Sequence, residues 1–553
     1  MKRPLSVLTR LSLGLASVAS LHAQSFTRQD SLRGTLSPLR SCYDVTHYDL
    51  RVQVDPATRR IEGSNVITYR PTADFRRMQV DLFANLDVTD IRQNGRPLKF
   101  SREGNALFLT LPEVQRKNRP ASLRISYRGR PIVAKNPPWD GGFSWKKDRS
   151  KNDWVTVSCE GTGASLWWPC KDHLSDEPDS MRIRIAAPAG LMAVANGNLR
   201  GVQKLKNGFS EYDWAVSYPI NTYNVTLNAG DYVPLHDTYR AADGDTLALD
   251  YYVFRYNRAI AGPHFAQVKP MLACYEQFFG KYPFWRDGYA LVETPYWGME
   301  HQGAIAYGNF FKNNPFGFDF IIVHESGHEY FGNSLSAADH AEMWIHEAFT
   351  TYMETLYLEC TKNYEESLRY LFTQRMKIKN DYPMLGPLGV NFQQKDTDVY
   401  YKGAWMLHTL RHVLANDALW FRTLKGLAVD FKWKIVKTEQ LVAYFNQKTG
   451  RNLTPFFDQY LRQTAPPKLE YQTRPAPNGL LLRYRWNAAE PGFDMPIDVT
   501  LDRGKTFRRL QPNSEWQTTT LPRTDDSTAS PEPLSVPFRI ATERFYAEGV
   551  EVK

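Results

Sequence analysis

The stretch HESGHEYFGN at positions 324–333 holds the residues whose spacing is best suited to chemistry. His324 and His328 are four positions apart, so on a helix both imidazoles point the same way and can bind one metal ion, with Glu325 beside them. Histidine is scarce, with 12 in 553 residues, so this spacing seldom arises by chance. Gly327 costs a helix about 1 kcal/mol relative to alanine, which indicates that another segment packs against its backbone. The pattern predicts the geometry of a zinc hydrolase, with two satisfied helix histidines as the alternative.

Zinc in a catalytic site takes three protein ligands and leaves one position open for water. Glu347 lies in WIHEAFT, residues 344–350, on the next predicted helix, with 18 residues between it and His328. A helix that returns antiparallel after a loop would bring this carboxylate to the histidine pair. Glu354, seven positions later on the same face, is expected either to orient a liganding histidine or to be an ordinary solvated glutamate. Glu325, free of the metal, would take the proton from zinc-bound water as that water attacks a carbonyl, and later deliver it to the leaving amine.

This pattern, HExxH followed by 18 residues and then glutamate, resembles the M1 family of zinc aminopeptidases, a gluzincin family. Three more segments carry the resemblance: residues 168–172 (WPCKD) resemble its PCxDxP segment, residues 297–301 (WGMEH) its GxMEN segment, and residues 400–403 (YYKG) its YxKG segment. The resemblance implies one Zn²⁺ per chain, with His324, His328 and Glu347 as its ligands.

The same resemblance implies roles for residues around the metal. Glu300 would pair with the substrate's α-ammonium group, which sets the cut one residue from the N-terminus. Glu160 matches a second amine anchor, with a surface glutamate as the alternative. Tyr400 would hydrogen-bond the oxyanion of the tetrahedral intermediate, although a shift of one position selects Tyr401, and either tyrosine could be a core residue. The residues expected to bind substrate are Glu160, Gly298, Met299 and Glu300.

Several positions depart from the family pattern. Trp297 replaces a usual glycine, and His301 and His346 replace usual asparagines, while the metal ligands and Glu325 are intact. These changes bear on substrate preference and anchor geometry; His301 is expected to ligate, to hydrogen-bond substrate or only to pack. Many family members carry a helical fourth domain over the active site, whereas 87 residues follow Pro466 here. We therefore expect a more open cleft that admits longer peptides.

The elements that position these residues fall into three parts. Hydrophobic residues alternate along residues 24–235 and again along 467–553, and they have helical spacing through much of 236–466. Pro466 and Pro467 end the helical pattern. The expected fold class is multidomain α+β. It comprises an N-terminal all-β domain (a β-sandwich or saddle), a thermolysin-like, mainly helical catalytic domain and a short C-terminal β-sandwich.

Residues 1–23 have the pattern of a signal peptide. Basic residues precede an apolar run from Leu11 to Ala19 that is short for a bilayer span, and Ala23 suits cleavage. We expect an exported protein, periplasmic or secreted, with no stable membrane anchor. The five cysteines contain no CxxC pair, which disfavours a thiolate zinc site. Export permits disulfides, and Cys159 with Cys170 is the closest pair in sequence, although the sequence leaves the pairing open.

Charge gives little support to an anionic partner. The formal net charge of +9 falls to +6 without the leader, and no block of five or six like charges follows it. Nucleic-acid binding is therefore disfavoured. The leading hypothesis is a zinc-dependent aminopeptidase that hydrolyses N-terminal residues from peptides with a free N-terminus. The alternatives are a zinc endopeptidase or a bifunctional epoxide hydrolase and aminopeptidase, and then a peptide-binding scaffold with weak activity. The preferred N-terminal residue and the oligomeric state do not follow from the sequence.

Overall fold

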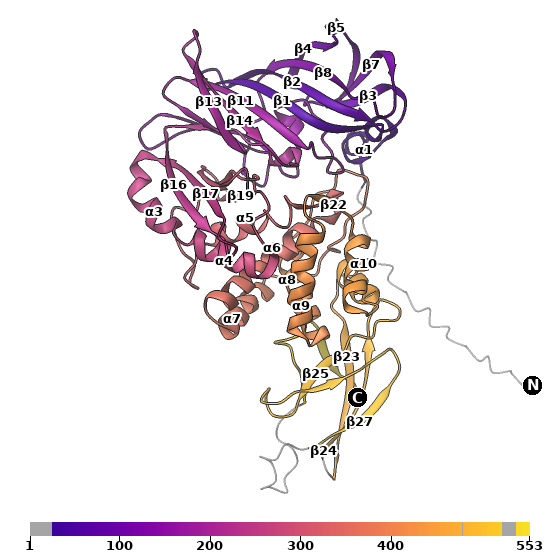
Figure 1. The fold of residues 1–553 in the computed structure, drawn as a ribbon. Helices are drawn as coiled ribbons and strands as arrows, with labels where there is room; N and C mark the ends of the chain where they lie inside the picture. The colour runs from indigo at the N-terminus through magenta and orange to yellow at the C-terminus, as the bar shows by residue number, and fades with distance from the viewer. Residues whose placement is uncertain (1–24, 478, 523–537) are drawn as a thin grey trace, which may run out of the picture.

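The computed structural model describes residues 25–477, 479–522 and 538–553, so the expected signal peptide lies outside the described residues. Figure 1 shows three parts in chain order, with the N-terminal strands in indigo to magenta, the helices below them and the C-terminal strands in yellow. One apolar core fills the N-terminal part, and a second runs from the helical part into the C-terminal sheets. This arrangement confirms the expected fold class.

The N-terminal part is built on an eight-stranded sheet in the order β13-β14-β11-β1-β2-β8-β4-β5, with sheets β12-β15-β10-β9 and β3-β7-β6 beside it. Its strands are β1 Tyr43–Asp55, β2 Arg60–Pro71, β3 Phe75–Asp81, β4 Leu86–Gln93, β5 Arg96–Pro97, β6 Lys99–Glu103, β7 Ala106–Gln115, β8 Ala121–Gly129, β9 Gly142–Lys147, β10 Asp153–Ser158, β11 Ser180–Pro188, β12 Met192–Val194, β13 Asn198–Lys204, β14 Phe209–Val216 and β15 Asn228–Gly230. Alternate residues Tyr48, Leu50 and Val52 of β1 are buried, as the period-two pattern predicts. Two short helices, α1 (Arg28–Gly34) and α2 (Pro38–Ser41), precede β1.

The catalytic part begins with a five-stranded sheet in the order β16-β17-β18-β20-β19. Its strands are β16 Tyr232–Arg240, β17 Thr246–Phe254, β18 Tyr289–Glu293, β19 Gly298–Met299 and β20 Ile305–Tyr307. The expected domain boundary between residues 235 and 236 therefore lies inside β16, because alternation continues from one sheet into the next without a change of period. β19 is the edge strand, and it carries the GxMEN-like segment.

Helices follow this sheet and surround one central helix. They are α3 Arg258–Phe265, α4 Val268–Phe279, α5 Phe320–Gly327, α6 Trp344–Thr361, α7 Tyr364–Arg375, α8 Asp398–Leu414, α9 Asp417–Asp430, α10 Thr438–Thr449 and α11 Thr454–Arg462; β21 (Leu335–Ala337) pairs with β22 (Lys434–Val436). Every residue of α6 from Trp344 to Leu358 is buried, because α4, α5, α7 and α8 pack around it. This helix is therefore buried on all sides along that stretch.

The C-terminal part is a small β-sandwich of sheets β27-β24-β23-β29 and β26-β25-β28. Its strands are β23 Lys468–Ala476, β24 Gly479–Asn487, β25 Ile497–Thr500, β26 Arg508–Leu510, β27 Gln517–Pro522, β28 Arg539–Ile540 and β29 Glu548–Glu551. Tyr546 fixes it to the helices: its N–H donates to Thr409 Oγ1 (2.9 Å), and its carbonyl accepts from the Tyr460 hydroxyl (2.7 Å).

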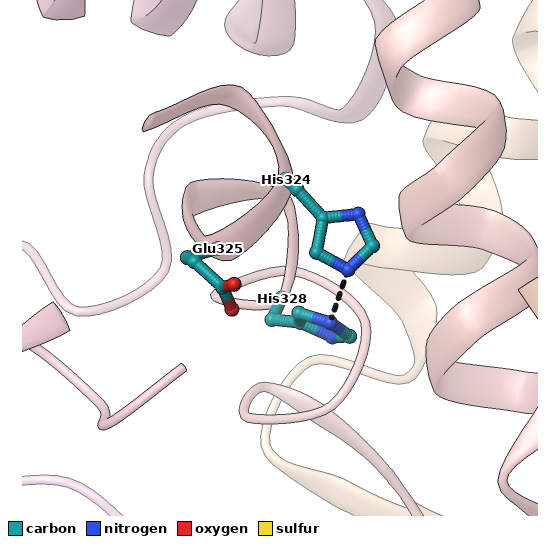
Figure 2. A group of neighbouring side chains, drawn as sticks. All are labelled: His324, Glu325 and His328. Atoms are coloured by element: carbon teal, nitrogen blue, oxygen red, sulfur yellow. Dashed lines mark hydrogen bonds between the residues drawn. The ribbon is translucent and has the colours of Figure 1, made fainter. Parts of the chain in front are cut away.

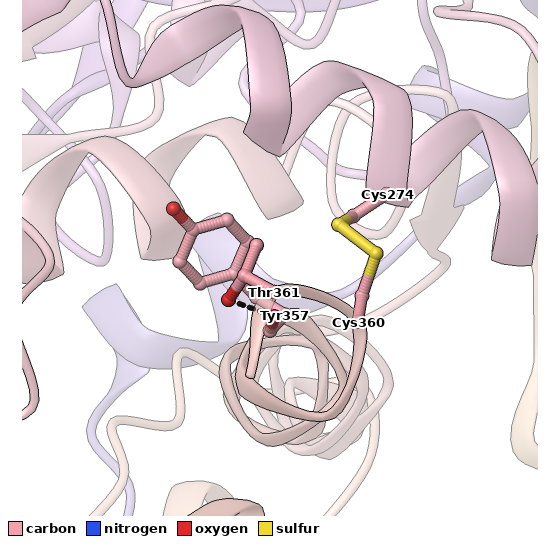
Figure 3. The surroundings of a disulfide bond; sticks show 4 residues. All are labelled: Cys274, Tyr357, Cys360 and Thr361. Carbon is pink, nitrogen blue, oxygen red and sulfur yellow. Dashed lines mark hydrogen bonds between the residues drawn. A yellow bond between two sulfur atoms is a disulfide. The ribbon is translucent and has the colours of Figure 1, made fainter. Parts of the chain in front are cut away.

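One disulfide joins Cys274 on α4 to Cys360 on α6 (Figure 3). The pair closest in sequence, Cys159 and Cys170, is not bonded. Both thiols are buried in the N-terminal core, and Cys159 Sγ donates to the Tyr223 carbonyl instead. Across the described residues, no helix combines the length and the apolar character that a membrane span requires.

Candidate active site

Helix α5 presents the two histidines. Its N-cap is Asp319, whose carboxylate accepts the N–H groups of Ile321 (3.0 Å) and Ile322 (3.4 Å), and its last residue is Gly327, with His328 as the C-cap. Because four positions make about one turn, Nε2 of His324 and Nε2 of His328 face each other at 3.3 Å (Figure 2).

The close packing expected at Gly327 is confirmed. A Cβ atom at this position would lie 2.9 Å from Thr350 Cγ2 and 3.5 Å from Met353 Sδ, both on α6. A larger residue would push α5 away from α6. The glycine therefore lets the helix that carries the histidines approach the helix that carries Glu347.

Glu347 completes a group of three converging atoms. Its Oε2 lies 3.6 Å from His324 Nε2 and 3.4 Å from His328 Nε2, and this oxygen is buried without a hydrogen-bond partner. A carboxylate oxygen of Glu325 also lies within 4.8 Å of the histidine nitrogens, but it is farther from them than the Glu347 oxygen. Atoms about 2.0–2.1 Å from one tetrahedral zinc ion are about 3.4 Å apart, so the Glu347 set fits zinc.

The other ring nitrogens fix which lone pairs point inward. Nδ1 of His324 lies 2.7 Å from Glu354 Oε1, and Nδ1 of His328 lies 3.0 Å from the Phe331 carbonyl, so each Nδ1–H donates outward. Both Nε2 lone pairs then face Glu347 Oε2, and three electron-rich atoms at this distance repel unless a cation binds between them. Burial alone would lower the pKa of His328, but Glu300 and Glu347 outweigh it and raise that pKa to about 9, so the cluster attracts positive charge.

Glu354 is not the solvated glutamate that the sequence left open. Its side chain is 1% exposed, and besides His324 it accepts the Tyr370 hydroxyl and Gln374 Nε2 (2.9 Å). Glu354 on α6, held by Tyr370 and Gln374 on α7, therefore keeps the His324 ring in one orientation.

Glu325 lies beside the three converging atoms, against the edge strand β19. A Cβ on Gly298 would be 2.4 Å from Glu325 Oε1, so the strand approaches the carboxylate closely only because this residue is glycine. Burial raises the pKa of Glu325 to about 7, against the opposing effect of His324 and His328. A carboxylate with this pKa is suited to accept and return a proton near neutral pH.

A cavity of about 400 Å³ opens onto this group. The residues expected at the site that line it are Glu160, Gly298, Met299, Glu300, His324, Glu325, His328, Glu347, Glu354 and Tyr400. No described residue beyond Tyr401 lines it, so the C-terminal sandwich does not close over the cavity. This agrees with the open cleft expected from the short C-terminal part.

Two carboxylates occupy the cavity apart from the metal group. Glu300 is 3% exposed and accepts the Tyr223 hydroxyl at 3.2 Å. Burial raises the pKa of Glu160, and the nearby charge of Glu300 raises it further. The pKa of Glu300 is raised by burial and by Glu347, and His328 opposes this rise. The mutual repulsion of the two carboxylates favours a bound cation, and an ammonium group such as a peptide N-terminus meets that need.

The two neighbouring tyrosines lie in different surroundings. The Tyr400 ring stacks at 6.1 Å from the His324 ring, and burial together with Glu347 raises the pKa of its hydroxyl, which therefore stays protonated as a donor. The Tyr401 hydroxyl instead accepts Lys377 Nζ at 3.3 Å. The position selected by the YxKG-like segment is thus the one beside the metal group.

His301 and His346, which differ from the family pattern, do not line the cavity. His301 is fully buried, burial lowers its pKa to about 3, and neither ring nitrogen has a hydrogen-bond partner, so it packs. His346 Nε2 accepts the Ala337 N–H at 2.9 Å and fixes β21. Three cavity residues on loops, Trp139, Gln394 and Asp396, have no motif around them that predicts a role in the site.

The fold and these side chains together define a metallopeptidase of the HExxH class. Two family models match the chain: the peptidase M1 N-terminal domain at residues 45–224 and the peptidase family M1 domain at residues 265–460. Together they cover more than half of it. The chain belongs to peptidase family M1. The family implies one Zn²⁺ per chain, and the converging atoms of His324, His328 and Glu347 fit that ion.

Curated relatives share the family at low identity. Aminopeptidase B of Rattus norvegicus is 22% identical over 441 residues, which are 74% of this chain and 65% of the relative. Aminopeptidase B of Homo sapiens is 23% identical over 366 residues, which are 63% of this chain and 53% of the relative. The chain thus spans between half and two thirds of their length. Leukotriene A-4 hydrolase of Xenopus laevis is 21% identical, with 73% of this chain and 69% of the relative covered.

Solved structures share the fold. An M1 zinc metallopeptidase from Deinococcus radiodurans superposes with a TM-score of 0.66 at 22% identity, and the match covers 76% of this chain and 94% of that one. A mutant of a two-domain M1 zinc metallopeptidase, bound to L-arginine, gives the same TM-score, identity and coverage.

Proposed function

We propose that this protein is a zinc-dependent aminopeptidase that hydrolyses the N-terminal residue from peptides. One observation carries the proposal: Glu300 and Glu160 line the same cavity as the metal group, and no lysine or arginine of the described residues lines it with them. A peptide ammonium bound between them places the first peptide bond, rather than an internal one, beside His324 and His328.

The proposed ligands are His324, His328 and Glu347. A bound Zn²⁺ would supply Lewis acidity and lower the pKa of water. Glu325, whose pKa lies near neutrality, accepts the proton of the attacking water and returns it to the leaving amine. The Tyr400 hydroxyl donates to the oxygen on which negative charge develops. Gly298 and Met299, on the edge strand β19, line the path of the substrate backbone.

Two alternatives remain as outcomes of the test. An endopeptidase would need no ammonium anchor, and an epoxide hydrolase would need room for an apolar chain. The paired carboxylates favour an N-terminal ammonium over either substrate. A relative named leukotriene A-4 hydrolase is the ground for the epoxide alternative, which hydrolysis of an epoxide substrate would support. Conversely, a peptide-binding scaffold would not need a carboxylate beside the ligand set with a pKa tuned to about 7.

We also propose that the protein is exported. The leader pattern in residues 1–23 motivates this, and the Cys274–Cys360 disulfide supports it because disulfides persist in oxidising compartments. Pulse labelling of the full chain, followed by cell fractionation, tests it. A processed species in the periplasm or medium is expected, and an unprocessed cytoplasmic protein would refute export.

The function is tested with matched aminoacyl reporters, one set unblocked and one N-acetylated, with and without chelator. Zinc-dependent hydrolysis of the unblocked set alone is expected. Equal rates on both sets would refute the ammonium anchor and support an endopeptidase. The Glu325→Gln variant should keep its zinc and lose about 10²–10⁴-fold in turnover.

A further inference from the structure

A short segment before β1 connects the N-terminal sheets to the loops of the active site. This segment, residues 27–35, contains α1 and is called the strap. Its N-cap Thr27 forms a capping box with Asp30. On one side it contacts the N-terminal part, where Gln79 Nε2 donates to the Leu32 carbonyl (3.0 Å) and His173 Nε2 to the Gly34 carbonyl (3.1 Å).

On its other side the strap packs against the loop of residues 389–394. The Asn391 N–H donates to the Asp30 carbonyl at 3.1 Å, and the Thr35 hydroxyl donates to the Gly389 carbonyl at 2.8 Å. A Cβ on Gly34 would lie 2.0 Å from the Val390 carbonyl carbon. The backbones of the strap and this loop are therefore in direct contact.

Arg33 reaches from the strap to two loops that lead to residues of the active-site cavity lining. Its Nη1 donates to the Gly161 carbonyl at 2.5 Å and to Asn391 Oδ1, and its Nε lies 3.8 Å from Asp172. Its side chain is 15% exposed. Gly161 directly follows Glu160, and Asn391 lies three residues before Gln394, another residue of the cavity lining.

We propose that Arg33 is a positioning residue for the ammonium-binding end of the cavity. The inference rests on the proposed function. Both hydrogen bonds come from Nη1, which donates to the two loops at once and so fixes their separation, and the rigid, planar guanidinium holds this nitrogen in place better than a flexible amine would. Arg33 holds the segment that contains Glu160 by donating to the main-chain carbonyl of Gly161, so that Glu160 stays opposite Glu300.

Tyr400 is held independently of the strap. Its helix begins at Asp398, whose carboxylate accepts the N–H groups of Lys379 (2.8 Å) and Asn380 (2.7 Å). Loss of Arg33 should therefore weaken the binding of an ammonium group while the metal group, Glu325 and Tyr400 keep their places.

The test compares Arg33→Met, Arg33→Lys and the matched control Arg28→Met. Arg28 is on the same helix, but it is 66% exposed and pairs with Glu103. With the best unblocked reporter, Arg33→Met should raise KM about tenfold with kcat within about twofold of the parent, because one fixed hydrogen-bonding group accounts for about that factor. Arg33→Lys should recover part of the loss, and Arg28→Met should match the parent.

A double variant separates positioning from general destabilisation. If Arg33 acts through Glu160, then Arg33→Met combined with Glu160→Gln should have the KM of Glu160→Gln alone. Calorimetric titration with the free amino acid released from that reporter should show the same non-additivity. An unchanged KM in Arg33→Met, an additive double variant, or a fall in kcat alone would overturn the proposal. If the parent protein hydrolyses the reporter and Arg33→Met has the same KM, only this inference is overturned. If the parent neither hydrolyses the reporter nor binds the amino acid, the proposed function is overturned as well.

Discussion

The carboxylate of Glu354 lies 2.7 Å from Nδ1 of His324, and both residues are buried. This contact fixes the tautomer of the imidazole, since a proton on Nδ1 leaves the Nε2 lone pair directed at His328 and Glu347. The carboxylate in turn is held by groups from α7. The orientation of one proposed ligand thus depends on a helix that contributes no ligand.

The Glu354→Gln variant should bind zinc about 10–100-fold more weakly than the parent. The amide has one acceptor oxygen, so its NH₂ group must face either the His324 N–H or the Tyr370 hydroxyl. Competition with a metallochromic chelator measures the affinity. Glu365→Gln, at an exposed position on α7, should leave it unchanged, and equal affinity in both variants would contradict the proposed role.

The Tyr400→Phe variant should lose about 10²–10³-fold in kcat with a KM near that of the parent, because its hydroxyl acts where charge develops. Tyr401→Phe is the matched control, since its hydroxyl contacts Lys377 and is expected to change kcat by less than about threefold. Steady-state kinetics on one reporter compare the two. A larger loss in Tyr401→Phe would assign the role to the neighbouring position.

The Gly298→Ala variant should lower kcat by at least about tenfold while zinc content stays at one ion per chain. The added methyl group would lie 2.4 Å from Glu325 Oε1, so either the proposed base or the edge strand must move. Gly262→Ala on α3 meets no atom within 4 Å and should be as active as the parent. Normal turnover in Gly298→Ala would show that Glu325 tolerates displacement.

The Glu293→Gln variant tests a titration remote from the metal group. Burial raises the pKa of Glu293 to about 7 from an ordinary value of 4.5. A raised carboxyl pKa stabilises the folded state below pH 4.5, and this contribution is lost as pH rises from 4.5 through 7. The amide does not titrate, so the variant does not lose this contribution. As pH rises across that window, the free energy of unfolding of the variant minus that of the parent should increase by up to about 3 kcal/mol. Urea unfolding at pH 4.5, 6 and 8 measures the gain, and parallel pH profiles would contradict it.

Reduction of the Cys274–Cys360 disulfide should lower the free energy of unfolding by up to about 4.5 kcal/mol, because the bond closes a loop with a sequence separation of 86. Denaturant unfolding with and without dithiothreitol measures the difference. The Cys274→Ser/Cys360→Ser double variant is the control, since the other three cysteines are free thiols. A reductant effect that persists in the double variant would contradict the assignment.

The sequence predicts the local part of this site well. His324, Glu325 and His328 lie within one helical turn, where geometry follows from spacing alone, and Gly327 signalled the approach of α6. The position of Glu347 relative to the histidines depends on how two helices pack, which spacing alone does not predict. The family resemblance supplied that information. The three-part order of the fold follows from changes in hydrophobic period.

Other features depend on contacts that no local pattern records. Arg33 lies 128 positions from Gly161, and nothing in its neighbourhood signals that it reaches the cavity. The bond between Cys274 and Cys360 likewise joins two helices that meet only in the folded core. The expected boundary at residues 235 and 236 lies within β16, and adjacent strands of different sheets have the same alternation, so the sequence has no local signal there.

The disulfide encloses Glu300, His324, Glu325, His328 and Glu347 within a single covalent ring. When an oxidised chain unfolds, the proposed ligands remain at a high effective concentration for one another. Metal binding to this ring would persist in the unfolded chain and reduce the gain in stability that zinc gives to the folded state.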